Sequence, residues 1–102
     1  MSEATLKAQI TEAMKDAMRA KAKARLGTIR LILADIKRIE VDERIELDDA
    51  RVLQILDKMV KQRRDSSQQF KDADRMDLAE QEDFEITVIE DFLPTALTDD
   101  EI

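Results

Sequence analysis

The stretch LGTIRLILADIKRIEV, residues 26–41, decides the fold class of this chain. Its apolar residues return every three or four positions, which is the spacing of one face of an α-helix. That stripe consists of Leu26, Ile29, Leu33 and Ile36, widened by Ile32 and Ile39. The stretch therefore predicts an amphipathic helix with one face against a core.

The same periodicity continues on both sides and predicts four helical segments, at about residues 3–21, 26–41, 49–70 and 75–92. Gly27 is the only glycine, so the break between the first two segments is predicted between residues 21 and 27. Asp48 is the predicted N-cap of the third segment, with Leu47 and Val52 at hydrophobic-staple positions. Between residues 60 and 70 this third segment turns polar, so that half is predicted to project past the core or to lie against another domain.

The composition supports a helical protein. One Gly and one Pro in 102 residues, with 40% charged residues, leave almost none of the turn chemistry that β-hairpins need. The predicted fold is therefore all-α, a compact four-helix domain. The absence of Cys and His from the sequence excludes disulfides, thiolate nucleophiles, the usual zinc sites and imidazole acid–base chemistry.

Two further patterns concern location and domain organisation. The longest strongly apolar stretch, residues 31–34, is too short to span a bilayer, and the N-terminus lacks the order of a signal peptide, so a cytoplasmic protein without a membrane partner is predicted. Residues 98–101 match the sequence pattern of a capping box, with Leu97 and Ile102 at the hydrophobic-staple positions, shortly after Pro94. We therefore expect a helical domain over residues 1–96, with residues 97–102 starting a linker or helix into a second small helical domain.

Charge is distributed unevenly along the chain. The net charge is −7, yet residues 1–40 carry nine Lys/Arg against five Asp/Glu, and residues 65–102 carry two against thirteen. An acidic total argues against indiscriminate coating of nucleic acid, although it leaves room for a local basic face.

The best candidate for such a face lies on the third segment, at Lys58, Lys61, Arg63 and Arg64. Arginine presents a planar fork suited to phosphate, so these cations predict contact with a tRNA backbone or an acidic partner. The alternative is a solvated helix face, on which Lys61 or Arg64 pairs locally with Asp57 or Asp65. A second basic set near the N-terminus, Lys15, Arg19, Lys21, Lys23 and Arg25, could extend the surface or simply favour a helix C-terminus.

No catalytic constellation is evident. The carboxylates Glu80, Glu82, Asp83 and Glu85 are best explained as solvated, and Ser66 and Ser67 have no His or Cys partner. There is no glycine-rich phosphate loop. We therefore assign no catalytic residue, no metal ligand and no cofactor.

The chain resembles the GatB/YqeY family of bacterial proteins over essentially its whole length. Five runs carry the resemblance: Ala13-Met14-Lys15 with Ala17-Met18, Arg25-Leu26-Gly27-Thr28-Ile29-Arg30, Lys61-Gln62-Arg63-Arg64-Asp65-Ser66 followed by Phe70, Ala73-Asp74-Arg75-Met76-Asp77-Leu78, and Glu90-Asp91-Phe92-Leu93-Pro94 with Leu97-Thr98. Asp74 stands where many relatives have Gly, and Ser67 replaces a commonly aliphatic residue. The resemblance implies an N-terminal helical domain followed by a smaller one similar to the tail of the B subunit of tRNA-dependent amidotransferases.

The resemblance also implies a function, and no family catalytic residue carries over onto this chain. The expected role is a non-catalytic helper associated with tRNA or with a tRNA-processing enzyme. One alternative is a component of glutamine-dependent amide transfer, a carbon–nitrogen ligase activity whose catalytic groups other polypeptides would supply. The other is a helical protein-interaction module without RNA binding, which an apolar stripe left exposed on the third or fourth helix would support. The sequence leaves the oligomeric state open.

Overall fold

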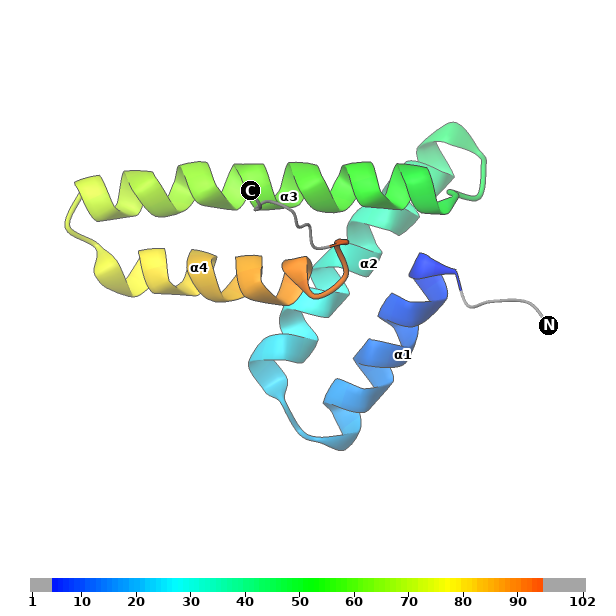
Figure 1. Cartoon of the computed structure of the whole chain (residues 1–102), viewed down its shortest axis with the longest axis horizontal. Coiled ribbons are helices and arrows are strands. Elements are labelled where there is room, and N and C mark those ends of the chain that lie inside the picture. The colour runs from blue at the N-terminus through cyan, green and yellow to red at the C-terminus, as the bar shows by residue number, and fades with distance from the viewer. Residues whose placement is uncertain (1–4, 95–102) are drawn as a thin grey trace. The chain divides into compact units, whose positions relative to one another are not determined.

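The computed structural model describes residues 5–94, and these form four α-helices without a strand: α1 (Leu6–Arg19), α2 (Lys23–Glu43), α3 (Asp49–Asp72) and α4 (Met76–Glu90) (Figure 1). This confirms the all-α prediction. The chain divides within α3 into two compact units, residues 1–55 and 56–102. The capping box expected at residues 98–101 lies outside the described residues. None of the described helices is both long enough and apolar enough to cross a membrane.

The first unit is built on a hairpin of α1 and α2. Thr5 begins α1, because its side-chain oxygen accepts a hydrogen bond of 3.0 Å from the backbone N–H of Ala8. The buried apolar side chains of the two helices are Leu6, Ile10, Ala17, Ile29, Ile32 and Ile36. The last three belong to the stripe predicted from the sequence, whose other members are half-buried.

Hydrogen bonds tie the connection after α2 to both helices of this unit. Glu40 accepts from Lys7 Nζ at 2.6 Å and from the backbone N–H of Leu47 at 2.9 Å. Asp49 accepts from the backbone N–H of Leu6 at 2.9 Å, which satisfies a donor at the start of α1. The backbone N–H of Arg51 donates to Asp48 at 3.0 Å, so the predicted cap of α3 is confirmed.

The three inter-helix turns share one geometry. Lys21, Arg44 and Asp74 have φ angles of 56°, 59° and 60°, in the left-handed region. In each turn the next N–H reaches back to a carbonyl five residues earlier, in the pairs Ala22–Ala17, Ile45–Glu40 and Arg75–Phe70. This is the Schellman ending of a helix, which usually takes glycine. The first break was predicted between residues 21 and 27, and it lies at the start of that range, where Lys21 makes the turn; Gly27, which suggested the break, lies inside α2.

Alanine in place of the glycine inside α2, and glycine in place of a left-handed turn residue, should each stabilise the protein. A Cβ added at Gly27 meets nothing within 4 Å, so Gly27→Ala should raise the free energy of unfolding by about 0.5–1 kcal/mol through helix propensity. Arg44→Gly should add roughly 0.5–1 kcal/mol, because relief of the left-handed strain exceeds the entropy that glycine adds to the unfolded chain. Urea denaturation of each variant measures both effects, and a loss of stability in either would contradict the assignment.

The second unit is an antiparallel hairpin of α3, from Leu56 onward, and α4 (Figure 1). Its larger buried apolar residues lie away from the turn at Asp74: Leu56, Met59 and Val60 on α3, and Val88 and Ile89 on α4; near the turn the small side chain of Ala79 is also buried. The polar half of α3 lies against α4 of the same unit, which corrects the expectation that it would project past the core or meet another domain. It does so because α4 offers carboxylates to its polar side chains.

Candidate partner-binding surface

The four cations predicted as a binding surface separate into two environments. All four lie on α3 in the second unit, within two turns of helix. Lys58, Lys61 and Arg64 are exposed to solvent, whereas Arg63 is turned toward α4. The structure therefore brings together three of the four residues on an exposed face of α3 and places the fourth in the hairpin.

Arg63 makes the most buried ion pair of this unit. Its Nε donates to Glu85 Oε1 at 2.8 Å, and the two side chains are only 16% and 14% exposed. Its Nη1 also donates to the carbonyl of Met59 at 3.4 Å. With two of its donors held inside the hairpin, Arg63 connects α3 to α4.

The exposed cations are held loosely. Lys61 Nζ lies 3.0 Å from Asp57, as the solvated-face alternative predicted, and the lysine side chain is 71% exposed. Arg64 pairs at 3.2 Å with Glu90 of α4 rather than with Asp57 or Asp65. Exposed ion pairs of this kind contribute about 0–1 kcal/mol, so a phosphate or carboxylate of a partner can displace them at little cost.

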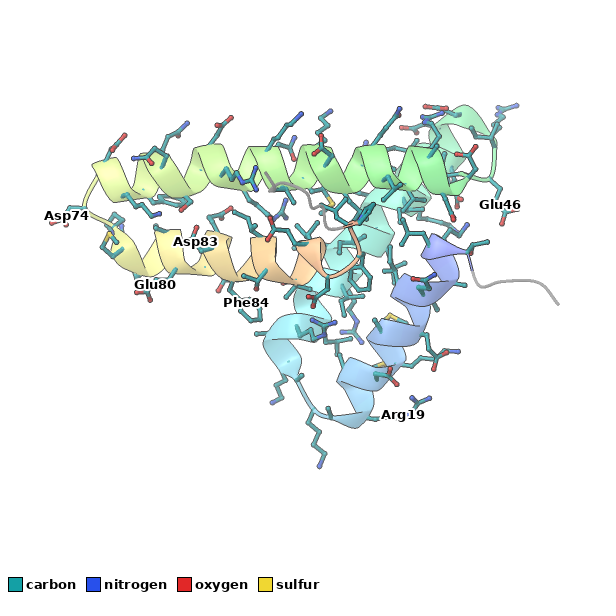
Figure 2. All side chains as sticks on the ribbon, viewed as in Figure 1. Arg19, Glu46, Asp74, Glu80, Asp83 and Phe84 are labelled. Carbon is teal, nitrogen blue, oxygen red and sulfur yellow. The ribbon has the colours of Figure 1, made fainter. Side chains whose placement is uncertain are left out.

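The outer half of the hairpin is held by a polar cluster between α3 and α4 that the sequence did not predict. Ser67 is buried and donates its hydroxyl proton to Asp83 Oδ1 at 2.7 Å, while Lys71 lies 3.7 Å from the same carboxylate. Figure 2 shows Asp83 between α3 and α4, with Glu80 and Phe84 on the far side of α4. The sequence did contain one indication of this cluster: Ser67, one helical turn after Arg63, replaces a commonly aliphatic residue.

The carboxylates of α4 are therefore only partly solvated. Glu80 is exposed as expected, but Asp83 and Glu85 bind side chains of α3. Burial raises the pKa of the Glu82 carboxyl, and the neighbouring charge of Glu85 raises it further. Within residues 5–94 no group of three or more acidic side chains is arranged to hold a metal ion.

The second basic set is dispersed. Lys15 and Lys23 are exposed, but Arg19 pairs with Asp16 at 2.6 Å and Lys21 forms the turn after α1. This set is therefore spread over α1, the turn after it and the start of α2, whereas the cations of α3 lie within two turns of one helix.

Comparison with known proteins assigns the chain to a family. The family model for YqeY-like proteins matches residues 7–102. The chain belongs to the YqeY-like family. This agrees with the resemblance stated from the sequence, and the YqeY-like chain keeps that resemblance over the whole helical part described above.

The curated relatives of this YqeY-like chain are fungal. It is 33% identical to an uncharacterized protein of Schizosaccharomyces pombe, over 87% of this chain and 72% of the relative. It is 37% identical to the altered inheritance of mitochondria protein 41 of Lachancea thermotolerans, over 84% of this chain and 46% of that protein. The protein of the same name from Clavispora lusitaniae is 41% identical, over 87% of this chain and 53% of the relative. The YqeY-like chain thus spans about half the length of the latter two.

These names bear on two expectations. The relatives of the YqeY-like chain give no support to the bacterial origin that the resemblance suggested, since they come from yeasts. The two longer relatives are named as mitochondrial, whereas the sequence of this chain suggested the cytoplasm. The cytoplasmic location therefore stays a prediction.

Proposed function

We propose that this YqeY-like chain is a non-catalytic helper that contacts the phosphate backbone of tRNA through Lys58, Lys61 and Arg64. The observation that carries the proposal is the exposed, weakly paired state of these three cations on one helix. Arg63, which the sequence interpretation included, serves the hairpin instead. The cations contact phosphates and do not stack on bases, because no aromatic side chain lies among them.

Electrostatics restrict how the RNA approaches. The sequence of α4 holds six acidic residues and no basic one, so RNA must reach Lys58 and Lys61 from the side of α3 that faces away from α4, and must displace Glu90 of α4 to reach Arg64. The acidic surface elsewhere repels a second strand or an unrelated polyanion. This arrangement favours contact with a few adjacent phosphates of one strand, and it disfavours the coating of a long stretch of nucleic acid.

The test is tRNA binding across a salt series. Each neutralised phosphate contributes about 0.7–0.9 to the slope of log affinity against log salt, so three contacts predict a slope near −2 to −3. Reversal of Lys58, Lys61 and Arg64 to Glu should remove most of the binding and flatten the slope. Reversal of Lys15, Lys23 and Arg44 to Glu changes the net charge equally on exposed residues of the first unit and should leave most binding in place.

Three outcomes would overturn the proposal. Equal losses from both triple variants would show that net charge matters rather than the α3 face. Equal affinity for an unrelated structured RNA would remove the tRNA assignment. Glutaminase or amidotransferase turnover by the isolated protein would contradict the non-catalytic role and favour the amide-transfer alternative.

A further inference from the structure

Helix α2 carries apolar residues on two opposite faces. Ile29, Ile32 and Ile36 are buried on one side. On the other side, small or apolar residues recur at helical spacing, and every one is exposed: Ala24, Gly27, Leu31, Ala34 and Val41. Arg38 is the one polar residue in this series, which we call the α2 seam.

The spacing of the seam is that of a coiled coil. A heptad repeat places apolar residues at its first and fourth positions, and this series follows that order from Ala24 to Val41. Its small residues allow two helices to approach closely, and nothing lies within 4 Å of a Cβ built at Gly27. The exposed face of α3 differs, since its residues are nearly all charged or amide side chains. An exposed apolar stripe was expected on the third or fourth helix if the chain binds proteins, and it lies on α2 instead.

The charges flanking the seam indicate the occupant. One flank carries Arg30 and Lys37, and the opposite flank carries Asp35 and Asp42. In a parallel pair of helices, each residue of the first flank faces the residue five positions later on the other copy. Arg30 then faces the partner subunit's Asp35, and Lys37 faces the partner's Asp42. An antiparallel pair would place like charges opposite one another on both flanks.

We propose that two copies of this chain pair in parallel and in register along the α2 seam. The pairing goes beyond the proposed tRNA contact and uses a different unit of the chain. The buried face of α2 points away from the seam, so pairing leaves the core of the first unit intact. The dimer then has four flanking ion pairs, and each copy supplies the cations of two of them, Arg30 and Lys37.

Arg38 sets the strength of the pairing. A single polar residue at a core position of a coiled coil fixes register and oligomeric state at a cost in affinity. Arg38 Nη2 lies 3.4 Å from Asp35 of its own helix, which offsets part of the repulsion between the two arginines. The dimer is therefore weak and depends on concentration.

Sedimentation velocity between about 5 and 500 µM tests the pairing, a range that covers weak self-association. The wild-type chain should shift from monomer to dimer. Ala34→Glu places a charge in the seam and should keep the chain monomeric. Ala8→Glu makes the same change at an exposed position of α1 and should dimerise as the wild type does, with circular dichroism confirming that both variants fold. A wild-type chain that stays monomeric, or an Ala34→Glu variant that still dimerises, would overturn the proposal.

Single cysteines test the orientation, because the chain has none of its own. Ala24→Cys and Val41→Cys mark opposite ends of the seam, about 26 Å apart along the helix. A parallel dimer predicts rapid disulfide formation within each variant and few mixed disulfides when the two are combined. Mixed disulfides in excess would show antiparallel pairing, and a rate no faster than that of Lys15→Cys would show random collision; either result contradicts the proposal.

Discussion

Arg63→Met should lower the free energy of unfolding by about 2–3 kcal/mol, near the lower end of what removal of one partner from a buried ion pair costs. Methionine keeps the apolar stem of the side chain as far as the arginine Nε but leaves the Glu85 carboxylate without its partner, in a site where that side chain is only 14% exposed. Glu85 retains one hydrogen bond, from Gln81 at 2.8 Å, which keeps the loss below that of a fully buried pair.

Urea denaturation measures this loss, and two further variants interpret it. Arg64→Met is the matched control, since the neighbouring arginine pairs with Glu90 at the surface and should cost only about 0–1 kcal/mol. Arg63→Met combined with Glu85→Leu should recover most of the stability, because it removes both charges. Equal losses at Arg63 and Arg64 would show that the Arg63 pair has no special role in the hairpin.

The loss at Arg63 should also depend on pH. The pKa of Glu82 is already raised by burial and by Glu85, and the charge of Arg63 opposes that rise. Without Arg63 the ionised carboxylates of α4 repel one another, and protonation relieves the repulsion. The Arg63→Met variant should therefore approach the stability of the wild type as the pH falls from 7 toward about 4.5.

Glu40→Ala should cost about 2 kcal/mol, because it removes the charged hydrogen bond from Lys7 and leaves the backbone N–H of Leu47 without its acceptor. Glu40→Gln keeps an acceptor for that N–H and should cost about half as much. The control is Glu43→Ala on the same helix, whose pair with Arg51 is exposed and should matter far less. A Glu43→Ala loss equal to that of Glu40→Ala would refute the assignment.

The free energy of unfolding of the wild type should depend on pH through the carboxylate of Glu40. The hydrogen bond from Lys7 holds the pKa of Glu40 below its ordinary value of 4.5, and the backbone N–H of Leu47 lowers it further. The folded state thus binds this proton less tightly than the unfolded chain does. The resulting stability is fully present above the unfolded pKa and disappears as the pH falls through the lower folded-state pKa. Glu40→Gln should lack this acidic loss.

Much of the fold could be predicted from the sequence, because helical periodicity and side-chain caps are local. The cap at Asp48 and the buried stripe of α2 are examples. The turns after the second and third helices lie in the predicted gaps, but the geometry of the turns could not be predicted. A left-handed residue is marked in the sequence only when it is glycine, and here Lys21, Arg44 and Asp74 take that conformation. Gly27, the residue that suggested the first break, consequently lies inside α2, and the turn itself is made by Lys21.

The candidate surface shows a different limit. Arg63 and Arg64 are neighbours in the sequence and carry the same chemistry, yet one is in the hairpin and the other is at the surface. What separates them is the position of Glu85 across the hairpin, which depends on how α4 packs. Local pattern identified the cations, and only the packing shows which of them remain available to a partner.

The hairpin of α3 and α4 should open in stages from its turn. Its closure depends on the Lys71–Asp83 and Ser67–Asp83 contacts near Asp74, with only the small Ala79 buried there, then on the Arg63–Glu85 pair, and finally on the larger buried apolar side chains beyond. Polar contacts near solvent yield to water more readily than buried apolar ones, so amide hydrogen exchange should slow progressively with distance from the turn. Each opening of the outer half would release the carboxylate of Asp83 and briefly give the hairpin tip a new acidic surface.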